Sequence, residues 1–438
     1  MNHVDHGSCP GYSEEIVLAT IKIMGSQSRS HSFDSLADDD VLTTSLFHKV
    51  LVGFNLPANW PSVVVWSIVS ILLLPVAAWW WWVSADIRLV IGVAAIQLVY
   101  FMADAYLLQR LPLLQISFGP WKGQFFALLF PRLAATLLLA SVVIWIGWLP
   151  AIAAVFTVQL LGTVALYRGA VVEPRSLGLT QLAIQTSRLP PGGRALRLLH
   201  ISDIHLERWS TREDQLLEWV RQSSPDLIVI TGDFVNLSFN VDPITHDQVR
   251  GLLAQLAAPY GVYAVLGSPP VDLHDTIPPL FQGLPVRLLR NEVVDITVGP
   301  DQSISLIGLD CHHDLSKDKT ALDLAVANLP EHRPQILLFH SPELMPQAVE
   351  RGIDLYVCGH THGGQVRLPI IGPILTSSRL GRRYAMGHYH EGQTHLYISR
   401  GIGFEGLGAP RVRLFCPPEV VLVTLGPLET TGLSRTQG

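Results

Sequence analysis

Polar side chains suited to metal binding follow apolar runs in the second half of the chain. Asp203 and His205 come directly after the run Leu196–Ser202, and Asp233 follows the run Asp226–Thr231. Carboxylate and imidazole groups together suit Mn, Fe, Zn, Ni or Co ions. These residues therefore indicate metal-ion chemistry, although an aspartate two residues before a histidine is a weak signal by itself.

Three later apolar runs end in the same way. Val262–Leu266 leads into Gly267-Ser268-Pro269-Pro270, Gln335–Phe339 leads into His340, and Asp354–Val357 leads into a segment with two histidines two residues apart. Ligands bind beyond the carboxyl ends of strands in α/β sheets, so we expect the polar residues to meet at one edge. The predicted metal ligands and catalytic residues are Asp203, His205, Asp233, His340, His360 and His362.

The elements that must position these residues alternate between strand and helix. Apolar strand-like runs are separated by helical patterns such as Asp214–Ser223, which indicates an α/β domain. Prolines and glycines between Pro174 and Gly193 break regular structure and predict a linker over residues 171–195. The α/β domain is expected over residues 196–426, followed by a C-terminal tail over residues 427–438.

The five segments, in this order, resemble the calcineurin-like metallophosphoesterase superfamily. The resemblance runs from about Arg194 to Leu425 and is closest to a membrane-linked branch, whose Gly-His-Thr-His-Gly-Gly-Gln motif is Gly359–Gln365 here. It implies a four-layer α/β/β/α sandwich, two divalent metal ions, and in-line attack on phosphorus by a water molecule that the metals activate. The implied ligands are Asp203, His205 and His362 for one metal and His340 and His360 for the other, with Asp233 bridging the two.

The third segment departs from the family pattern, which is Gly-Asn-His followed by Asp or Glu. The asparagine of the family is a metal ligand, and Ser268 has a shorter reach. The histidine steadies a phosphoryl oxygen or protonates the leaving group, and Pro269 can do neither. Either the bond cleaved needs little help at its leaving group, as a phosphoanhydride does, or the domain is a catalytically weak metal- or nucleotide-binding membrane sensor. His274 or Asp275 could substitute, but ordinary loop positions are favoured for both.

Two other histidine groups are expected to lie outside the site. Cys311-His312-His313-Asp314 has the composition of a metal tetrad, but adjacent loop residues rarely face one ion, so we predict a solvated loop. His388, His390 and His395 are predicted to be surface residues.

The first half of the chain has a different composition. Of 438 residues, 49% are hydrophobic and 15% are charged, whereas soluble proteins carry about 25% charge. The apolar residues concentrate between Pro61 and Tyr167, in four runs that each fit the range of about 17–25 residues for a transmembrane helix. The runs are Ser62–Val83, Leu89–Leu108, Phe125–Leu149 and Ala151–Tyr167, so residues 61–170 are predicted to form four transmembrane helices after a mobile tail over residues 1–60.

Charges and tryptophans predict the orientation of these helices. Tryptophans at Trp79–Trp82, Trp145 and Trp148 mark one interface, whereas basic residues cluster at the other ends of the helices. Positive residues stay in the cytoplasm, so we expect a multi-pass protein of the cell membrane with its α/β domain inside. Asp104 and Arg132 lie within the helices, and either they form an ion pair or Arg132 extends to the interface.

These observations predict a membrane-anchored, metal-dependent phosphohydrolase that cleaves a phosphoester or phosphoanhydride. The short linker would keep the site near the bilayer, which favours a lipid-linked or membrane-proximal phosphorylated substrate. The net charge of −6 gives no reason to expect a nucleic-acid partner.

Overall fold

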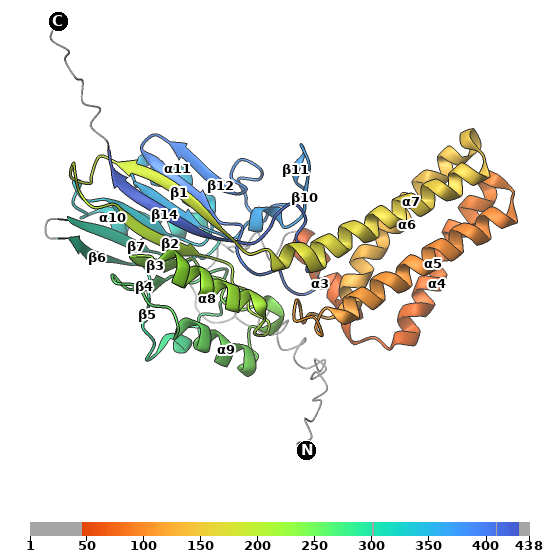
Figure 1. Ribbon diagram of the computed structural model, residues 1–438, viewed down its shortest axis with the longest axis horizontal. Coiled ribbons are helices and arrows are strands. Elements are labelled where there is room, and N and C mark those ends of the chain that lie inside the picture. The colour runs from red at the N-terminus through yellow and green to blue at the C-terminus, as the bar shows by residue number, and fades with distance from the viewer. Residues whose placement is uncertain (1–45, 300–301, 409, 429–438) are drawn as a thin grey trace, which may run out of the picture.

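The protein has a helical bundle at one end and a domain of stacked sheets at the other (Figure 1). The structure is a computed structural model that describes residues 46–299, 302–408 and 410–428. The expected N-terminal tail up to residue 45 and the expected C-terminal tail from residue 429 lie outside the described residues.

Within the described residues, four helices are long and apolar enough to span a membrane: α4 (Ser62–Ser84), α5 (Ile87–Arg110), α6 (Trp121–Ile146) and α7 (Trp148–Tyr167). This confirms the prediction of four long apolar helices, but α6 begins at Trp121 instead of Phe125. Large apolar side chains point outward from the bundle, since Ile71 is 61% exposed and Leu138 is 72% exposed. Such a surface suits contact with lipid better than contact with water.

The part of the expected N-terminal tail that the structure describes belongs to the bundle. Leu46–Asn55 forms helix α3, and a turn of 3₁₀ helix follows over Leu56–Asn59. The ring centroid of Phe54 lies 5.9 Å from that of Phe130 in α6, and Trp60 lies 5.9 Å from Phe126. Aromatic packing against α6 therefore fixes this segment.

Asp104 and Arg132 form an ion pair inside the bundle. Arg132 Nε donates to Asp104 Oδ2 at 2.6 Å, and Nη2 donates to Oδ1 at 2.8 Å. Arg132 Nη1 also donates to the backbone and side-chain oxygens of Gln159, both at 2.8 Å. Of the two possibilities left open by the sequence, the structure thus shows the pair, which links α5, α6 and α7.

Replacing Arg132 by leucine is expected to destabilise the bundle by about 3 kcal/mol, because it leaves the buried carboxylate of Asp104 without a partner. A double variant, Asp104→Leu with Arg132→Leu, should recover most of that loss because no charge is stranded. Thermal unfolding in detergent would measure the stability of the single and the double variant. Equal stability of these two variants would contradict this role of the pair.

The α/β domain contains two six-stranded sheets in the part of the chain that the structure describes. The first has the order β1 (Gly178–Thr186), β14 (Glu419–Pro427), β2 (Leu196–Ile201), β3 (Leu227–Ile230), β4 (Val262–Ala264) and β5 (Val286–Leu288). The second has the order β12 (Gly387–Glu391), β13 (Thr394–Ile398), β9 (Leu355–Cys358), β8 (Gln335–Leu338), β7 (Gln302–Gly308) and β6 (Glu292–Gly299). β10 (Arg367–Leu368) and β11 (Gly372–Pro373) pair antiparallel and form a short hairpin.

Three apolar cores divide the domain into four layers. One core packs α8 (Thr211–Ser223) and α9 (Pro243–Leu253) against the first sheet. A second core lies between the sheets, where Leu198 and Val229 meet Ile336. The third packs α10 (Leu315–Val326) and α11 (Met345–Glu350) against the second sheet. The expected four-layer α/β/β/α sandwich is confirmed.

The expected linker is shorter in the structure than residues 171–195. Its middle forms β1, which pairs in parallel with β14 from Gly178 to Thr186. The helical segment from α7 continues to Arg175, so only a few residues separate the bundle from the first sheet. A short connection of this kind limits how far the domain can move from the bundle.

Buried polar contacts also join the bundle to the domain. Glu207 is fully buried and accepts hydrogen bonds from the backbone N–H of Phe118 at 2.5 Å and from Ser117 Oγ at 3.2 Å, both between α5 and α6. The guanidinium of Arg411, also fully buried, pairs with the same carboxylate. Because Glu207 lies two residues after His205, the first predicted metal-binding loop is attached directly to the bundle.

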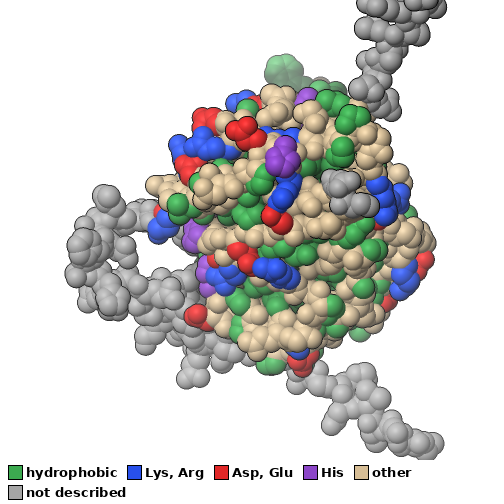
Figure 2. All heavy atoms as spheres, turned by 90° about the vertical axis from the view of Figure 1, so that its left-hand side faces the viewer, with side chains coloured by type: hydrophobic (Ala, Val, Ile, Leu, Met, Phe, Trp, Pro, Cys, Tyr) green, Lys and Arg blue, Asp and Glu red, His purple; other side chains and the backbone are tan. Residues whose placement is uncertain are grey.

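The face of the domain turned away from the bundle has a different surface. Figure 2 shows acidic and basic side chains interspersed there, with hydrophobic side chains in small separate groups. A mixed surface of this kind suits water.

Candidate functional site

Four of the predicted ligands form one buried cluster. Asp203, His205, Asp233 and His362 each offer a ligand atom, and these atoms all lie within 4.8 Å of one another. His205 Nε2 lies 3.0 Å from His362 Nε2 and 3.3 Å from Asp233 Oδ2. The residues come from the ends of β2 and β3, which are parallel neighbours in the first sheet, and from the end of β9 in the second sheet. The carboxyl ends of strands from both sheets therefore meet at the cluster, whereas the sequence had suggested one edge.

The other two predicted ligands lie on the far side of Asp233. His340 Nε2 is 3.3 Å from Asp233 Oδ2 and 3.1 Å from the hydroxyl oxygen of Ser268. The same hydroxyl oxygen is 3.4 Å from His360 Nδ1. The structure thus brings all six residues together, with Asp233 between the two groups.

Hydrogen bonds to backbone carbonyl groups orient the two imidazole rings beside Ser268. His340 Nδ1 lies 2.7 Å from the carbonyl oxygen of Thr231, and His360 Nε2 lies 3.2 Å from that of Ser377. Each of these nitrogens is placed to donate to its carbonyl, which leaves the other ring nitrogen as a lone-pair donor aimed at the cluster. Carbonyl partners of this kind fix the tautomer of metal-binding histidines.

A divalent cation fits this cluster. Asp203 Oδ2 is buried without a hydrogen-bond partner, although Asp203 Oδ1 accepts the backbone N–H of His360 at 2.9 Å. A buried carboxylate oxygen without a donor is costly unless a cation neutralises it. His205 Nε2 and His362 Nε2 face each other at 3.0 Å, so either a proton or a cation must lie between them.

The backbone at the cluster is held in an uncommon conformation. Five of the six predicted ligands have positive φ angles, and these are Asp203 (49°), His205 (42°), Asp233 (54°), His360 (70°) and His362 (50°). Left-handed backbone is rare for residues other than glycine and clusters at functional sites. Close packing adds a second constraint, because a Cβ on Gly359 would lie 1.9 Å from Asp203 Oδ2.

The charges of the cluster offset one another. Burial lowers the pKa of His205, His360 and His362, which favours the neutral imidazole that a metal requires. Burial acts in the same direction on His340, but the charge of Asp233 and its hydrogen bond outweigh it and raise the pKa of His340 to about 10. Without a metal, a proton on His340 therefore balances the buried aspartates.

Sequence reasoning missed Asp272, which holds the third segment in place. Its fully buried carboxylate accepts the backbone N–H groups of Asp233 at 2.7 Å, Gly267 at 2.8 Å and Phe234 at 3.0 Å. Burial and the charge of Asp233 raise the pKa of Asp272 to about 7. The signal in the sequence was an acidic residue two positions after Pro270.

The segment Cys311–Asp314 is not the solvated loop that the sequence predicted. Cys311 is fully buried, and the ring centroid of His313 lies 5.0 Å from that of His360. Arg379 Nη2 donates to the carbonyl oxygen of His313 at 2.8 Å, which ties the segment to the loop after β11. A further imidazole therefore lies against the predicted second metal site.

The two residues proposed as substitutes for the missing histidine lie elsewhere. His274 and Asp275 are exposed, and the ring of His274 lies 6.2 Å from that of His312. His388 and His390 are exposed, as expected of surface residues, whereas His395 is partly buried.

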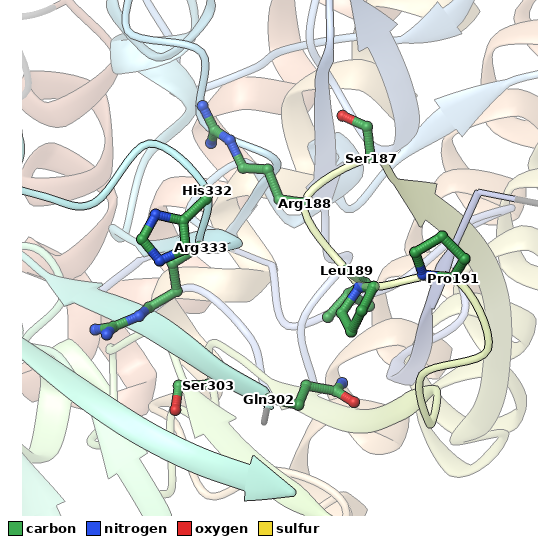
Figure 3. Close-up of a pocket in the computed structure, with 9 residues that line it drawn as sticks. Ser187, Arg188, Leu189, Pro191, Gln302, Ser303, His332 and Arg333 are labelled. Atoms are coloured by element: carbon green, nitrogen blue, oxygen red, sulfur yellow. The ribbon is translucent and has the colours of Figure 1, made fainter. Parts of the chain in front are cut away.

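A cavity of about 430 Å³ elsewhere in the domain is unsuited to a phosphate. Figure 3 shows Arg188, His332 and Arg333 around it, at the starts of β7 and β8. Its arginines already have partners, because Arg188 pairs with Asp354 at 2.7 Å and Arg333 pairs with Asp295. The predicted ligands lie at the opposite ends of these strands.

Comparison with known proteins identifies the family. Residues 196–364 match the profile of the calcineurin-like phosphoesterase family. Over 261 residues the chain is 31% identical to the metallophosphoesterase YkuE of Bacillus subtilis (strain 168), an alignment that covers 58% of this chain and 87% of YkuE. The chain belongs to the calcineurin-like phosphoesterase family.

Two other relatives of this phosphoesterase carry the name of an activity. The phosphodiesterase YaeI of Escherichia coli (strain K12) is 28% identical over 235 residues, which cover 52% of this chain and 82% of YaeI. The UDP-2,3-diacylglucosamine pyrophosphatase LpxG of Chlamydia muridarum (strain MoPn / Nigg) is 25% identical over 314 residues, which cover 58% of this chain and 90% of LpxG. Family and relatives support hydrolase activity for the phosphoesterase.

Proposed function

We propose that this phosphoesterase is a membrane-anchored, dinuclear phosphohydrolase that cleaves a phosphoester or phosphoanhydride bond of a lipid-linked substrate at the cytoplasmic face. The observation that carries the proposal is the gathering of five predicted ligands around the sixth, Asp233. Asp203, His205 and His362 would hold one metal ion, and His340 and His360 the other.

The bound metals would polarise the phosphoryl group and supply an activated water molecule. The chain itself positions them, since Asp233 faces both groups and its Oδ1 is held by the backbone N–H of Ser268 at 2.7 Å. Ser268 Oγ lies within 3.5 Å of Asp233, His340 and His360, so the hydroxyl takes the place that the family gives to an asparagine.

His313 supplies a group that the third segment lacks. Pro269 has no side-chain donor, whereas the imidazole of His313 lies beside the ring of His360. Burial lowers the pKa of His313 well below its usual value. The neutral ring can still donate one hydrogen bond, so we assign it to a phosphoryl or leaving-group oxygen.

The membrane part of the proposal rests on the bundle and its attachment. Basic residues at the ends of the helices nearest the domain, such as Arg110, Lys122 and Arg175, support a cytoplasmic position of the site. The buried Glu207–Arg411 pair keeps the metal-binding loops close to those ends. The names of LpxG and YaeI support diphosphate and phosphodiester bonds as candidates.

Metal dependence provides the first test. Purified full-length protein with manganese is expected to hydrolyse bis(p-nitrophenyl) phosphate, to lose that activity in EDTA and to regain it when manganese is restored. A His360→Ala variant should lose about 10²-fold or more in turnover, because a displaced metal costs several kcal/mol of transition-state stabilisation.

The same experiment distinguishes the alternative of a catalytically weak sensor, which the Ser268-Pro269 segment favours. Metal binding measured by calorimetry without turnover of phosphodiesters or diphosphates would support the sensor. Turnover equal in the wild type and in His360→Ala would contradict the proposed site.

A further inference from the structure

A cavity connects the metal-binding loops with the helical bundle. Its volume is about 490 Å³, and its lining is mostly apolar. Ala127 and Pro131 of α6 and Ala165 of α7 form one wall, while His362 and Leu375 of the domain form another. The volume falls in the range of about 300–1,000 Å³ that ligand sites occupy. An apolar space thus runs from a predicted metal ligand to two helices that can span a membrane.

Small residues keep this space open. Gly162 of α7 lines the cavity, and a Cβ at that position would lie 3.1 Å from Arg132 Nη1. Pro131 has no N–H to donate to the carbonyl of Ala127, so α6 is weakened beside the cavity. Among the described residues of α6 and α7 that line the cavity, only Leu128 and Leu166 have large side chains.

The β10–β11 hairpin closes the cavity on the domain side and has an apolar surface of its own. Ile374 and Leu375 line the cavity and are still 48% and 57% exposed, and Ile370 at the tip is fully exposed. Figure 1 places this hairpin beside the end of α7 nearest the domain. Exposed isoleucines next to membrane-spanning helices suit insertion among lipid headgroups.

Basic residues follow the hairpin directly. Arg379, Arg382 and Arg383 are exposed, and Arg379 also contacts the segment of His313 through its guanidinium. Basic side chains beside an apolar insertion attract anionic lipids of the cytoplasmic leaflet. The charge and the apolar tip therefore favour the same partner, a lipid that carries phosphate.

We propose that this cavity binds the hydrocarbon chain of a lipid phosphate whose phosphoryl group lies at the metal cluster. The proposal rests on the proposed function and names the substrate class, which is a membrane lipid that enters between α6, α7 and the hairpin. The chain would lie along Ala127 and Ala165, and His362 marks the inner end of the cavity.

The test uses two chromogenic diesters that differ only in chain length, p-nitrophenyl hexadecyl phosphate and p-nitrophenyl methyl phosphate, with full-length protein in mixed micelles. The wild type should prefer the hexadecyl diester by about tenfold or more in kcat/KM. Ala165→Trp should remove that preference by filling the cavity, and it should leave the methyl diester within about twofold. Leu161→Trp is the matched control, because Leu161 lies on the same helix and is 61% exposed outside the cavity.

A second measurement is independent of turnover. Hexadecyl phosphate with a diazirine near the chain end should label residues of α6 and α7 at the cavity, and Ala165→Trp should abolish the labelling. Labelling elsewhere, or an unchanged chain preference in Ala165→Trp, would overturn the chain site while metal-dependent cleavage of the methyl diester still supported the proposed function. Labelling at the cavity without cleavage of either diester would retain the chain site and refute the hydrolase.

Discussion

An Asp233→Asn variant should lose turnover by about 10³-fold or more, the largest effect expected of any single substitution in this protein. Asparagine has nearly the shape of aspartate and can keep the hydrogen bond from the backbone N–H of Ser268. Asparagine lacks the negative charge of Asp233, whose Oδ2 lies 3.3 Å from both His205 Nε2 and His340 Nε2. The loss therefore reports metal binding, with little change in packing.

Thermal unfolding provides a readout of Asp233 that does not depend on activity. A ligand that binds only the folded state at 100 times its Kd stabilises that state by about 2.7 kcal/mol. Manganese should therefore raise the Tm of the wild type and barely raise that of Asp233→Asn. Burial disfavours the ionised carboxylate of Asp233, but the charge of His340 outweighs burial and lowers the pKa of Asp233. Without metal, the variant should therefore be less stable than the wild type, so the comparison uses the manganese-dependent change in Tm of each protein.

Asp247→Asn is the matched control for this experiment, because Asp247 is an exposed aspartate on α9. It should keep both the turnover and the manganese-dependent rise in Tm. A normal metal response in Asp233→Asn would contradict the placement of Asp233 between two metal ions.

The architecture was predictable where local pattern determines it. Apolar runs of fixed length predicted the four long helices, and strand ends followed by polar residues predicted where Asp203, Asp233 and His340 would gather. Both inferences depend on residues close together in the sequence, or on a rule about parallel strands that holds across α/β folds.

Contacts between distant segments were not predictable in this way. β1 was taken as linker because the prolines and glycines on either side of Gly178–Thr186 suggested irregular structure, but pairing with β14, more than two hundred residues later, makes it a strand. Glu207 gave no sign that its carboxylate would be buried against Arg411 and the turn before α6. Such partners are set by tertiary packing, which overrides local propensity.

His313 shows the same limitation within the site. Four adjacent polar residues at Cys311–Asp314 suggested a solvated loop, because neighbouring side chains on a loop seldom face one ion. The structure turns the chain through a positive φ of 55° at His313 and places its ring beside His360. The local sequence predicts neither the turn at His313 nor its contact with His360.

Replacing His313 by alanine should therefore lower turnover in a way that depends on the leaving group. For a diester with an alkyl leaving group, we expect a loss of about 10²-fold, because the hydrogen bond from the neutral imidazole to the developing alkoxide contributes up to about 3 kcal/mol. For a p-nitrophenyl leaving group, whose anion is stable without help, the loss should be only about threefold. Turnover of the two substrates, measured with one preparation of His313→Ala and one of the wild type, would give the two losses.

Two comparisons separate this role from a structural one. His388→Ala removes an exposed histidine of β12 and should leave both rates unchanged. The manganese-dependent rise in Tm should persist in His313→Ala, because the six predicted ligands remain. Equal losses on both substrates, together with a lost metal response, would show that His313 only supports His360. Pro269 stands where the family has its histidine, so a double variant, His313→Ala with Pro269→His, tests whether that position can replace His313. If the double variant hydrolyses the alkyl diester faster than His313→Ala does, either position can supply the hydrogen-bond donor.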